Sequence, residues 1–270
     1  MSAIVLPDTT TVQPRAARIA CVIPARLEST RLPRKMLASI LGRPMLAWVL
    51  DAAAASTRLA SVGVATDSDE IAALVQSLGH TVYRTGPANS GSDRIAQVLD
   101  RLNADVVMNL QGDEPVMTTA TIDATLAFFD AGRAWPLVST AASPSHDPEL
   151  RESPNAVKVV TNKAGKALYF SRSAIPSRGP AGAVPNEADK QPTLIHLGIY
   201  AYRVDVLRQF SQLSPSLLEQ RERLEQLRLL DNGIDIQVAT VPDLAFGVDT
   251  EDDRLRAEQF LRTRGHQAGR

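Results

Sequence analysis

Residues 18–35 read RIACVIPARLESTRLPRK, and this stretch decides the fold class. It begins with a short, mostly apolar run that ends at Pro24, which is typical of a buried β-strand. The loop that follows is rich in cations and contains a single acid, Glu28. The cations are Arg26, Arg31, Arg34 and Lys35. A buried strand that runs directly into a basic loop predicts an α/β fold with an anion site beyond the end of the first strand.

Short β-branched runs then alternate with helical patterns, which predicts a mostly parallel, Rossmann-like sheet covered by helices. We expect strands at 18–23, 62–65, 80–84, 105–110 and 137–141. We expect helices at 44–55, 67–79, 92–102 and 119–131. Pro44 suits the first turn of its helix, and Asp67 with Glu70 has capping-box spacing at the start of the next. This half of the chain is typical of a nucleotide-binding α/β domain.

From about residue 154 the pattern becomes antiparallel, because runs 156–160 and 167–170 flank the hairpin signal Asn162 to Gly165. Further elements are expected at 193–202 (strand), 215–231 (helix), 234–241 (strand) and from about 250 (helix). Residues 176–192 are rich in proline and small residues, which predicts a mobile loop. We therefore expect a disordered leader over residues 1–17 and a domain over 18–270 with a smaller antiparallel lobe at about 154–212.

Composition excludes several classes of function. Lys plus Arg, at 29, nearly cancels Asp plus Glu, at 30, so no overall positive field attracts a nucleic acid. The single cysteine, Cys21, excludes an intramolecular disulfide and a cysteine-based zinc site, and it fits the reducing cytoplasm. Charged residues or prolines interrupt every long apolar run, so we expect no membrane span.

The basic loop at 24–35 is a candidate phosphate site. The chain contains neither G-x-x-x-x-G-K-[ST] nor G-x-G-x-x-G, so the two familiar backbone cradles for phosphate are absent. Guanidinium and ammonium groups would have to neutralise the phosphates instead. The alternative is a solvated basic loop, but its position after the first strand favours a phosphate site.

A second candidate is Gln111-Gly-Asp-Glu-Pro115, directly after the apolar strand at 105–110. Asp113 at the carboxyl end of a strand is well placed for Mg²⁺, which binds few carboxylates together with waters and substrate phosphates. The alternative is a polar turn before a helix.

A third candidate is the strand at 193–202. Its alternation places Ile195, Leu197, Ile199 and Ala201 on one face and His196, Gly198, Tyr200 and Tyr202 on the other. We expect Gly198 to leave room for a ligand between its two ring-bearing neighbours. The alternative is a second buried face with satisfied polar tips. In the helix at 215–231 we expect Leu217, Leu224 and Leu227 to form the buried stripe.

Nine segments, in order, carry a resemblance to one family. They are IPARLESTRLPRK at 23–35, ATDSDEIA at 65–72, SGSDRIAQV at 90–98, NLQGDEP at 109–115, SPNAVKVV at 153–160, ALYFSRSAIP at 167–176, HLGIYAYR at 196–203, LEQLRLL at 224–230 and GVDTEDD at 247–253. They resemble the CMP-3-deoxy-manno-octulosonate (CMP-KDO) synthetases over nearly everything from residue 19 to 258. The resemblance implies a nucleotidyltransferase domain, transfer of CMP from CTP to KDO for lipopolysaccharide biosynthesis, and a homodimer formed through the antiparallel lobe.

The resemblance also implies roles for individual residues. The CTP phosphates would contact Arg26, Arg31 and Lys35, beside Pro24 and Ala25. The cytidine side would be shaped by Ala65, Asp67, Ser92, Arg94 and Gln111. The magnesium ligands would be Asp113 and Asp249, and the sugar-acid pocket would hold Arg172, His196, Tyr200, Glu225 and Gln226. The chain departs from the family pattern at Arg34, where glycine is common, and at Met36, where proline is common.

Three alternatives stay open at this point. A sister enzyme could act on amino-KDO or sialic acid. A metal-dependent glycosyltransferase could use Asp67-Ser-Asp69 as a D-x-D metal motif, although this triplet fits a helix cap better. Asp249 precedes the acidic run Glu251 to Asp253, so it could favour a helix N-terminus rather than bind metal.

Overall fold

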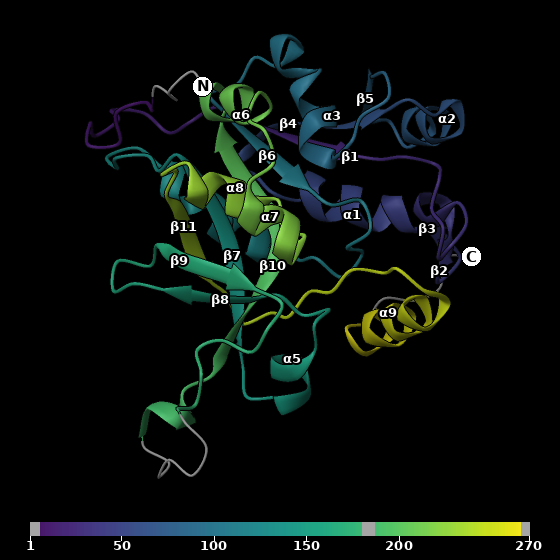
Figure 1. The fold of residues 1–270 in the computed structure, drawn as a ribbon. Helices are drawn as coiled ribbons and strands as arrows, with labels where there is room; N and C mark the ends of the chain where they lie inside the picture. Colours follow the sequence, from purple (N-terminus) through teal and green to yellow (C-terminus); the bar gives the residue numbers. More distant parts are fainter. Residues whose placement is uncertain (1–5, 180–186, 266–270) are drawn as a thin grey trace.

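The computed structural model describes residues 6–179 and 187–265, which fold around one large twisted sheet (Figure 1). Its strands lie in the order β11-β7-β10-β6-β1-β4-β5. Their bounds are β1 Ile19–Pro24, β4 Leu59–Thr66, β5 Thr81–Arg84, β6 Val106–Leu110, β7 Val138–Ser145, β10 Thr193–Arg203 and β11 Ile236–Thr240. Every pairing along this path is parallel except those of β10, which runs antiparallel to both β6 and β7. The predicted mostly parallel α/β sheet is confirmed.

Helices cover both faces of the sheet, and each face has its own apolar core. One core includes side chains from α1 (Met45–Ala54), α2 (Asp69–Ser77), α4 (Thr119–Leu126) and α9 (Glu251–Thr263). The other includes α3 (Gly91–Ala96), α6 (Val204–Phe210) and α8 (Gln226–Asp231). Strand alternation divides β1 between them, since Cys21 and Ile23 face the first core and Val22 the second. The remaining short elements are η1 Lys35–Leu37, β2 Ser39–Ile40, β3 Arg43–Pro44, η2 Leu99–Arg101, η3 Ala127–Phe129, α5 Pro148–Glu152, α7 Leu217–Glu222 and η4 Glu187–Lys190.

The antiparallel segment is smaller than the sequence predicts. The hairpin β8 (Lys158–Thr161) and β9 (Ala167–Ser171) forms where expected, with Gly165 at φ +74° in its turn. It projects beside the main sheet (Figure 1) and joins it at two points, where Lys158 pairs with Ile195 of β10 and Lys166 bridges Gln237 of β11. However, β10 itself lies inside the main sheet between β6 and β7. The expected lobe at 154–212 is therefore corrected to the β8–β9 hairpin and its connections.

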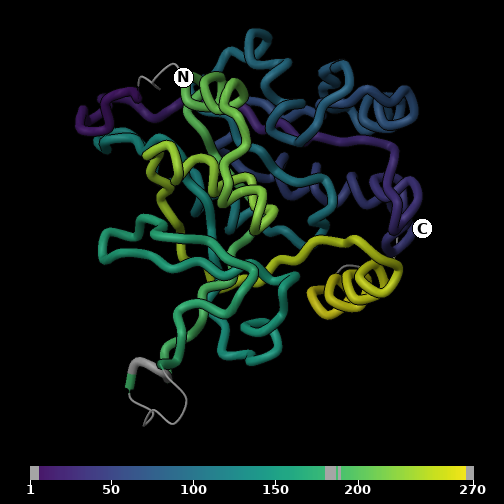
Figure 2. Tube along the Cα trace, viewed as in Figure 1, coloured from purple at the N-terminus to yellow at the C-terminus, as the bar shows by residue number. Residues whose placement is uncertain are grey.

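The leader also differs from its prediction in part. Gln13 donates its N–H to the carbonyl of Arg133 at 2.9 Å, and Val12 forms a bridge with Ala134. Arg15 pairs with Asp105 at 2.6 Å. Residues 6–17 therefore follow the surface of the domain, whereas residues 1–5 of the predicted disordered leader lie outside the described residues. The tube in Figure 2 shows this purple segment next to the teal loop that contains Arg133 and Ala134. Within the predicted mobile loop, 180–186 also lie outside them.

Two helix predictions need correction. The helix expected over 215–231 divides into α7 and α8 at Arg223, whose backbone is left-handed with φ +55°. Leu217, expected in the buried stripe, is 83% exposed, while Leu224 and Leu227 are buried. At α2 the capping side chain is Ser68, which accepts from the N–H of Ile71, and not Asp67. None of the helices within residues 6–179 and 187–265 has the length and apolar character needed to cross a bilayer.

Candidate active site

Lys35 connects the two predicted magnesium ligands. Its ammonium nitrogen lies 2.5 Å from Oδ2 of Asp113 and 2.9 Å from Oδ1 of Asp249. Arg31 pairs with the other oxygen of Asp249 at 2.9 Å. Burial alone would lower the pKa of Lys35, but the charges and hydrogen bonds of the two carboxylates raise it above its ordinary value. Two carboxylates and two cations thus form one neutral cluster.

The sheet brings these distant residues together. Asp113 follows β6 at its carboxyl end, and Lys35 lies at the end of the basic loop after the adjacent strand β1. The N–H of Val248 donates to the carbonyl of Asp113 at 2.8 Å, which holds Asp249 beside it. The ligands of open α/β sheets bind at this rim.

Asp249 is not the capping residue of helix α9. Helix α9 is capped by Thr250, whose hydroxyl accepts from the N–H of Asp253 in a capping box. The carboxylate of Asp249 turns instead to Lys35 and Arg31. Burial opposes ionisation of Asp249, but these two cations lower its pKa overall.

The basic loop keeps the backbone shape that a glycine would allow. Arg34 adopts φ +55° and ψ +36°, a left-handed conformation that costs a non-glycine residue about 1–2 kcal/mol. Its guanidinium pairs with Glu70 of α2. Met36 is buried, with its sulfur next to the position that a side chain on Gly112 would take. Arg26 is exposed and has no hydrogen bond or ion pair to any described residue.

The residues predicted to shape the cytidine side also gather at this rim. Pro24 of β1 pairs with Ala65 of β4, and the N–H of Ala25 donates to the carbonyl of Ala65 at 2.9 Å. Arg94 is buried and donates to Asp67 at 3.0 Å, which fixes this carboxylate just beyond β4. Gln111 donates to the side chain of Asn109 at 3.2 Å.

Ser92 links this group to the predicted sugar-acid pocket. Its hydroxyl donates to Oε2 of Glu225 at 2.9 Å, and Ser90 donates to Oε1 at the same distance. Burial raises the pKa of Glu225, although these two hydrogen bonds and the charge of Arg228 oppose the shift. Gln226, the next residue, is buried at the start of α8. The two predicted subsites therefore share a wall.

His196 and Tyr200 lie in β10, whose first half extends past the carboxyl end of β6, since Ile199 pairs with Leu110. The His196 ring packs against Phe170 at 5.1 Å and Tyr200 at 5.3 Å between centroids. Burial lowers the pKa of His196 to about 3, so the imidazole is neutral at pH 7.

A hydrogen bond fixes the orientation of this ring. The Thr140 hydroxyl lies 3.0 Å from His196 Nε2 and 2.7 Å from the carbonyl oxygen of Ile199. The Tyr200 hydroxyl is buried without a partner among the described residues.

Sequence reasoning missed Glu114. Its side chain is buried, Oε2 has no partner among the described residues, and a side chain on Gly198 would overlap Oε1. The space at Gly198 that the sequence assigns to a ligand is thus filled by this carboxyl group. Burial, with a contribution from the charge of Asp113, raises the pKa of Glu114 to about 8. Only its position after Asp113 could have drawn attention to it.

Arg172, expected in the sugar-acid pocket, is engaged by main-chain carbonyls. Its guanidinium donates to Pro154 at 2.9 Å and to Glu222 at 2.8 Å, which ties the hairpin to the end of α7. Lys158, also missed, is fully buried, and its ammonium donates to the carbonyls of Ser153, Ala156 and Arg172 at 2.8, 2.6 and 2.5 Å. A lysine in an alternating strand gives no sign of this role.

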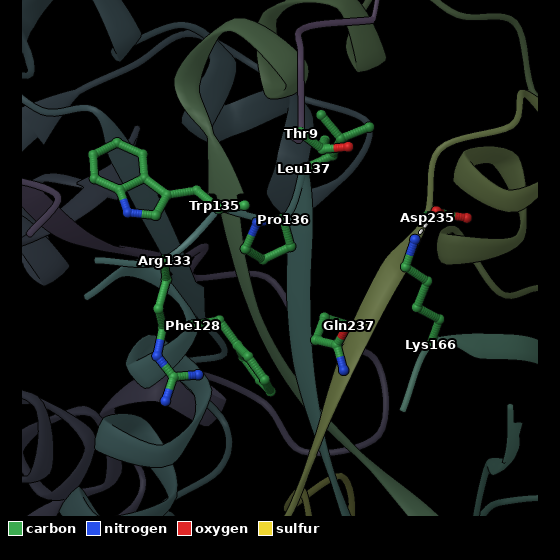
Figure 3. Close-up of a pocket in the computed structure, with 10 residues that line it drawn as sticks. Thr9, Phe128, Arg133, Trp135, Pro136, Leu137, Lys166, Asp235 and Gln237 are labelled. Atoms are coloured by element: carbon green, nitrogen blue, oxygen red, sulfur yellow. Dashed lines mark hydrogen bonds and ion pairs between the residues drawn. The ribbon is translucent and has the colours of Figure 1, made fainter. Parts of the chain in front are cut away.

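Cavities do not mark the site by themselves. One cavity of about 530 Å³ has Glu225, Ser90 and Arg223 in its wall. Another, of about 320 Å³, lies at the opposite, amino end of β7 and β11 (Figure 3). Trp135, Arg133 and the paired Lys166 and Asp235 line it. It is remote from the ion cluster.

The donor set fits magnesium. Within residues 6–179 and 187–265, no group of three or more histidine, cysteine or acidic side chains could hold a metal ion. The carboxylates of Asp113 and Asp249 meet at Lys35, on the rim where a triphosphate would lie. This arrangement matches the preference of Mg²⁺ for few carboxylates together with phosphate oxygens and waters. The metal would complete its shell with substrate.

Comparison with known proteins identifies the family. The sequence matches the family described as "Cytidylyltransferase" over residues 20–236. It is 48% identical to the 3-deoxy-manno-octulosonate cytidylyltransferase of Acidobacterium capsulatum over 242 residues, which is 89% of this chain and 95% of the relative. The chain belongs to the 3-deoxy-manno-octulosonate cytidylyltransferase family. The relative from Chloroherpeton thalassium, with the same name, is 43% identical over 89% of this chain and 96% of its own length.

Solved structures of cytidylyl-group enzymes resemble this fold over most of the chain. A CMP:2-keto-3-deoxy-manno-octonic acid synthetase complexed with CTP superposes with a TM-score of 0.82 and 39% identity, over 92% of this chain and 99% of that one. The 4-diphosphocytidyl-2C-methyl-D-erythritol synthase of Anaerococcus prevotii has a TM-score of 0.60 at 13% identity, over 91% of this chain and 96% of that one, and so shares the fold.

Proposed function

We propose that this chain transfers CMP from CTP to the anomeric hydroxyl of 3-deoxy-D-manno-octulosonate and releases pyrophosphate. The observation that carries the proposal is the cluster of Arg31, Lys35, Asp113 and Asp249 at the carboxyl rim of the sheet. Its position suits a triphosphate, and relatives that share nearly the whole chain carry this activity in their names.

In this proposal Arg26, Arg31 and Lys35 contact the triphosphate. Arg26 is exposed at the same rim, which leaves its guanidinium available to a ligand. Cations that neutralise phosphate oxygens stabilise the charge that moves onto pyrophosphate as it leaves. Asp113 and Asp249 would hold Mg²⁺, which would supply further neutralisation of the developing negative charge.

The nucleophile is the anomeric hydroxyl of the sugar acid, which attacks the α-phosphorus in line. The hydrogen bond between Ser92 and Glu225 supports this arrangement, because it joins a residue proposed for the cytidine subsite to one proposed for the sugar-acid subsite. The chain mainly positions the substrates, so no covalent enzyme intermediate is needed. His196, with its neutral imidazole, and Tyr200, whose buried hydroxyl has no partner among the described residues, are proposed to contact the sugar acid.

Pyrophosphate release tests the proposal. The purified protein is given CTP and Mg²⁺ with KDO, amino-KDO or sialic acid in separate reactions. We expect the highest kcat/KM with KDO. A preference for another acid would assign the chain to a sister cytidylyltransferase.

The glycosyltransferase alternative receives no support from the D-x-D triplet. Ser68 in the middle of the triplet caps α2, Asp67 pairs with the buried Arg94, and the Asp69 side chain is 94% exposed, so the triplet forms the start of this helix. Activity on a nucleotide sugar, with none on CTP and any sugar acid, would revive it.

We also propose that the enzyme works as a homodimer in the cytoplasm, through the β8–β9 hairpin. Leu168 of β9 is 60% exposed. Beyond the bridge between Lys166 and Gln237, β9 pairs only with β8 among the described strands, which leaves an edge that a second copy could cover. A sedimentation mass equal to one chain would reject the dimer.

A further inference from the structure

The positions that would hold magnesium already have internal counter-ions. The ammonium of Lys35 is within hydrogen-bond distance of both carboxylates, and its side chain is only 11% exposed. Arg31 neutralises the remaining oxygen of Asp249. The two negative charges that a divalent cation needs are therefore balanced before any metal binds.

A triphosphate would disturb this balance. It is a stronger attractor for Arg31 and Lys35 than two carboxylates are, because it concentrates several negative charges on adjacent oxygens. Arg31 is 64% exposed and sits in the loop between Pro24 and η1, so its side chain is free to turn. If both cations turn to phosphate, Asp113 and Asp249 are left as bare carboxylates at the phosphate chain.

We propose that Lys35 is a transferable counter-ion that blocks the metal ligands in the free protein and releases them when its ammonium turns to the nucleotide. The inference rests on the proposed use of CTP and magnesium, and it adds an order to their binding. Metal binding is weak without nucleotide, and nucleotide strengthens it by removing the competitor. The two ligands then assist each other by the same factor in both directions.

A structural role for Lys35 predicts something different. A lysine that only ties Asp113 to Asp249 would lower stability when removed, and metal affinity would fall because the carboxylates would separate. A transferable counter-ion predicts the opposite for metal. Nucleotide-free Mn²⁺ affinity should rise when the ammonium is removed.

The experiment measures free Mn²⁺ by electron paramagnetic resonance in titrations of nucleotide-free protein. The variants are Lys35→Met and Lys35→Gln, whose unbranched or amide-ended side chains are one atom shorter than lysine and carry no charge. Lys163→Met is the matched control, because Lys163 is exposed and remote from the cluster. We expect Lys35→Met and Lys35→Gln to bind Mn²⁺ at least about tenfold tighter than wild type, and Lys163→Met to match wild type.

A second variant shows whether the gained ion uses the same ligands. Lys35→Met/Asp113→Asn should lose the gain. Calorimetry in EDTA measures CTP binding without metal. Asp113→Asn should bind CTP more tightly than wild type, because Lys35 then has only its ion pair with Asp249 to break before it turns to the nucleotide. Lys35→Met should bind CTP more weakly, because it lacks the ammonium group.

The proposal is overturned if both Lys35 variants bind Mn²⁺ no more tightly than wild type while their circular dichroism spectra show that they are natively folded. Because none of these titrations needs turnover, they separate this inference from the proposed function. Wild type that makes CMP-KDO while Lys35→Met gains no Mn²⁺ affinity would leave the function intact and reject the counter-ion. If Lys35→Met gains Mn²⁺ affinity but the wild-type protein cannot use KDO, the counter-ion role stands and the proposed function is rejected.

Discussion

Replacing Asp249 by Asn tests metal binding without disturbing the cap of helix α9. Asn keeps the shape of the side chain and leaves the Thr250 capping box of α9 in place. It removes the charge that pairs with Lys35 and Arg31, but the Asp249 side chain is 43% exposed, so these pairs contribute at most about 1 kcal/mol to stability. The free energy of unfolding should therefore change by less than about 1 kcal/mol.

The effect of Asp249→Asn on catalysis should be much larger. One of two carboxylate ligands would become a neutral amide, and a bound metal supplies several kcal/mol of stabilisation to the transition state. Since each 1.4 kcal/mol is a factor of ten in rate, we expect kcat/KM at limiting magnesium to fall by about two to three orders of magnitude.

Thr250→Ala is the matched control. It removes the cap and should cost about 1 kcal/mol of stability, with pyrophosphate release at limiting magnesium close to wild type. Urea unfolding and pyrophosphate release measured on both variants give opposite patterns. Full activity of Asp249→Asn at limiting magnesium would refute the role of this carboxylate.

Three further predictions concern β10. His196→Ala should raise the KM for the sugar acid more than the KM for CTP, and equal changes in steady-state kinetics would indicate a purely structural role. Burial lowers the pKa of His196 from 6.5 to about 3, so the unfolded chain binds the proton more readily. Wild type should therefore lose stability relative to His196→Gln as the pH falls below 6.5, by on the order of 1 kcal/mol per pH unit; parallel urea-unfolding curves down to pH 4.5 would contradict this. Gly198→Ala should cost about 1–3 kcal/mol because its methyl group overlaps Glu114, and the cost should shrink in a Glu114→Ala background, as a double-mutant cycle would measure.

The order and type of the main elements could be predicted from sequence because they depend on local periodicity. The apolar run before Pro24 became β1, and the alternation of β10 does place Ile199 in one core and Tyr200 in the other. The convergence of Asp113 and Asp249 was also predictable, since the resemblance suggested it and both follow apolar runs that lead to one rim.

Features that depend on distant partners were not predictable. The helix expected over 215–231 has no proline at its break, yet it ends at Arg223, where Leu224 turns into the core and Glu225 meets the hydroxyls of Ser90 and Ser92. Tertiary contacts outweigh helix propensity there. The buried roles of Lys158 and Glu114 likewise follow from partners that no local pattern reveals.

The most direct test of the central claim is ³¹P nuclear magnetic resonance of the purified protein with CTP, Mg²⁺ and KDO. We expect the CTP signals to be replaced by equal amounts of pyrophosphate and a phosphodiester, only when KDO is present and not with an Asp113→Asn variant of native fold. Persistence of CTP in the complete reaction with wild type, or its conversion to CMP without KDO, would contradict the proposed transfer.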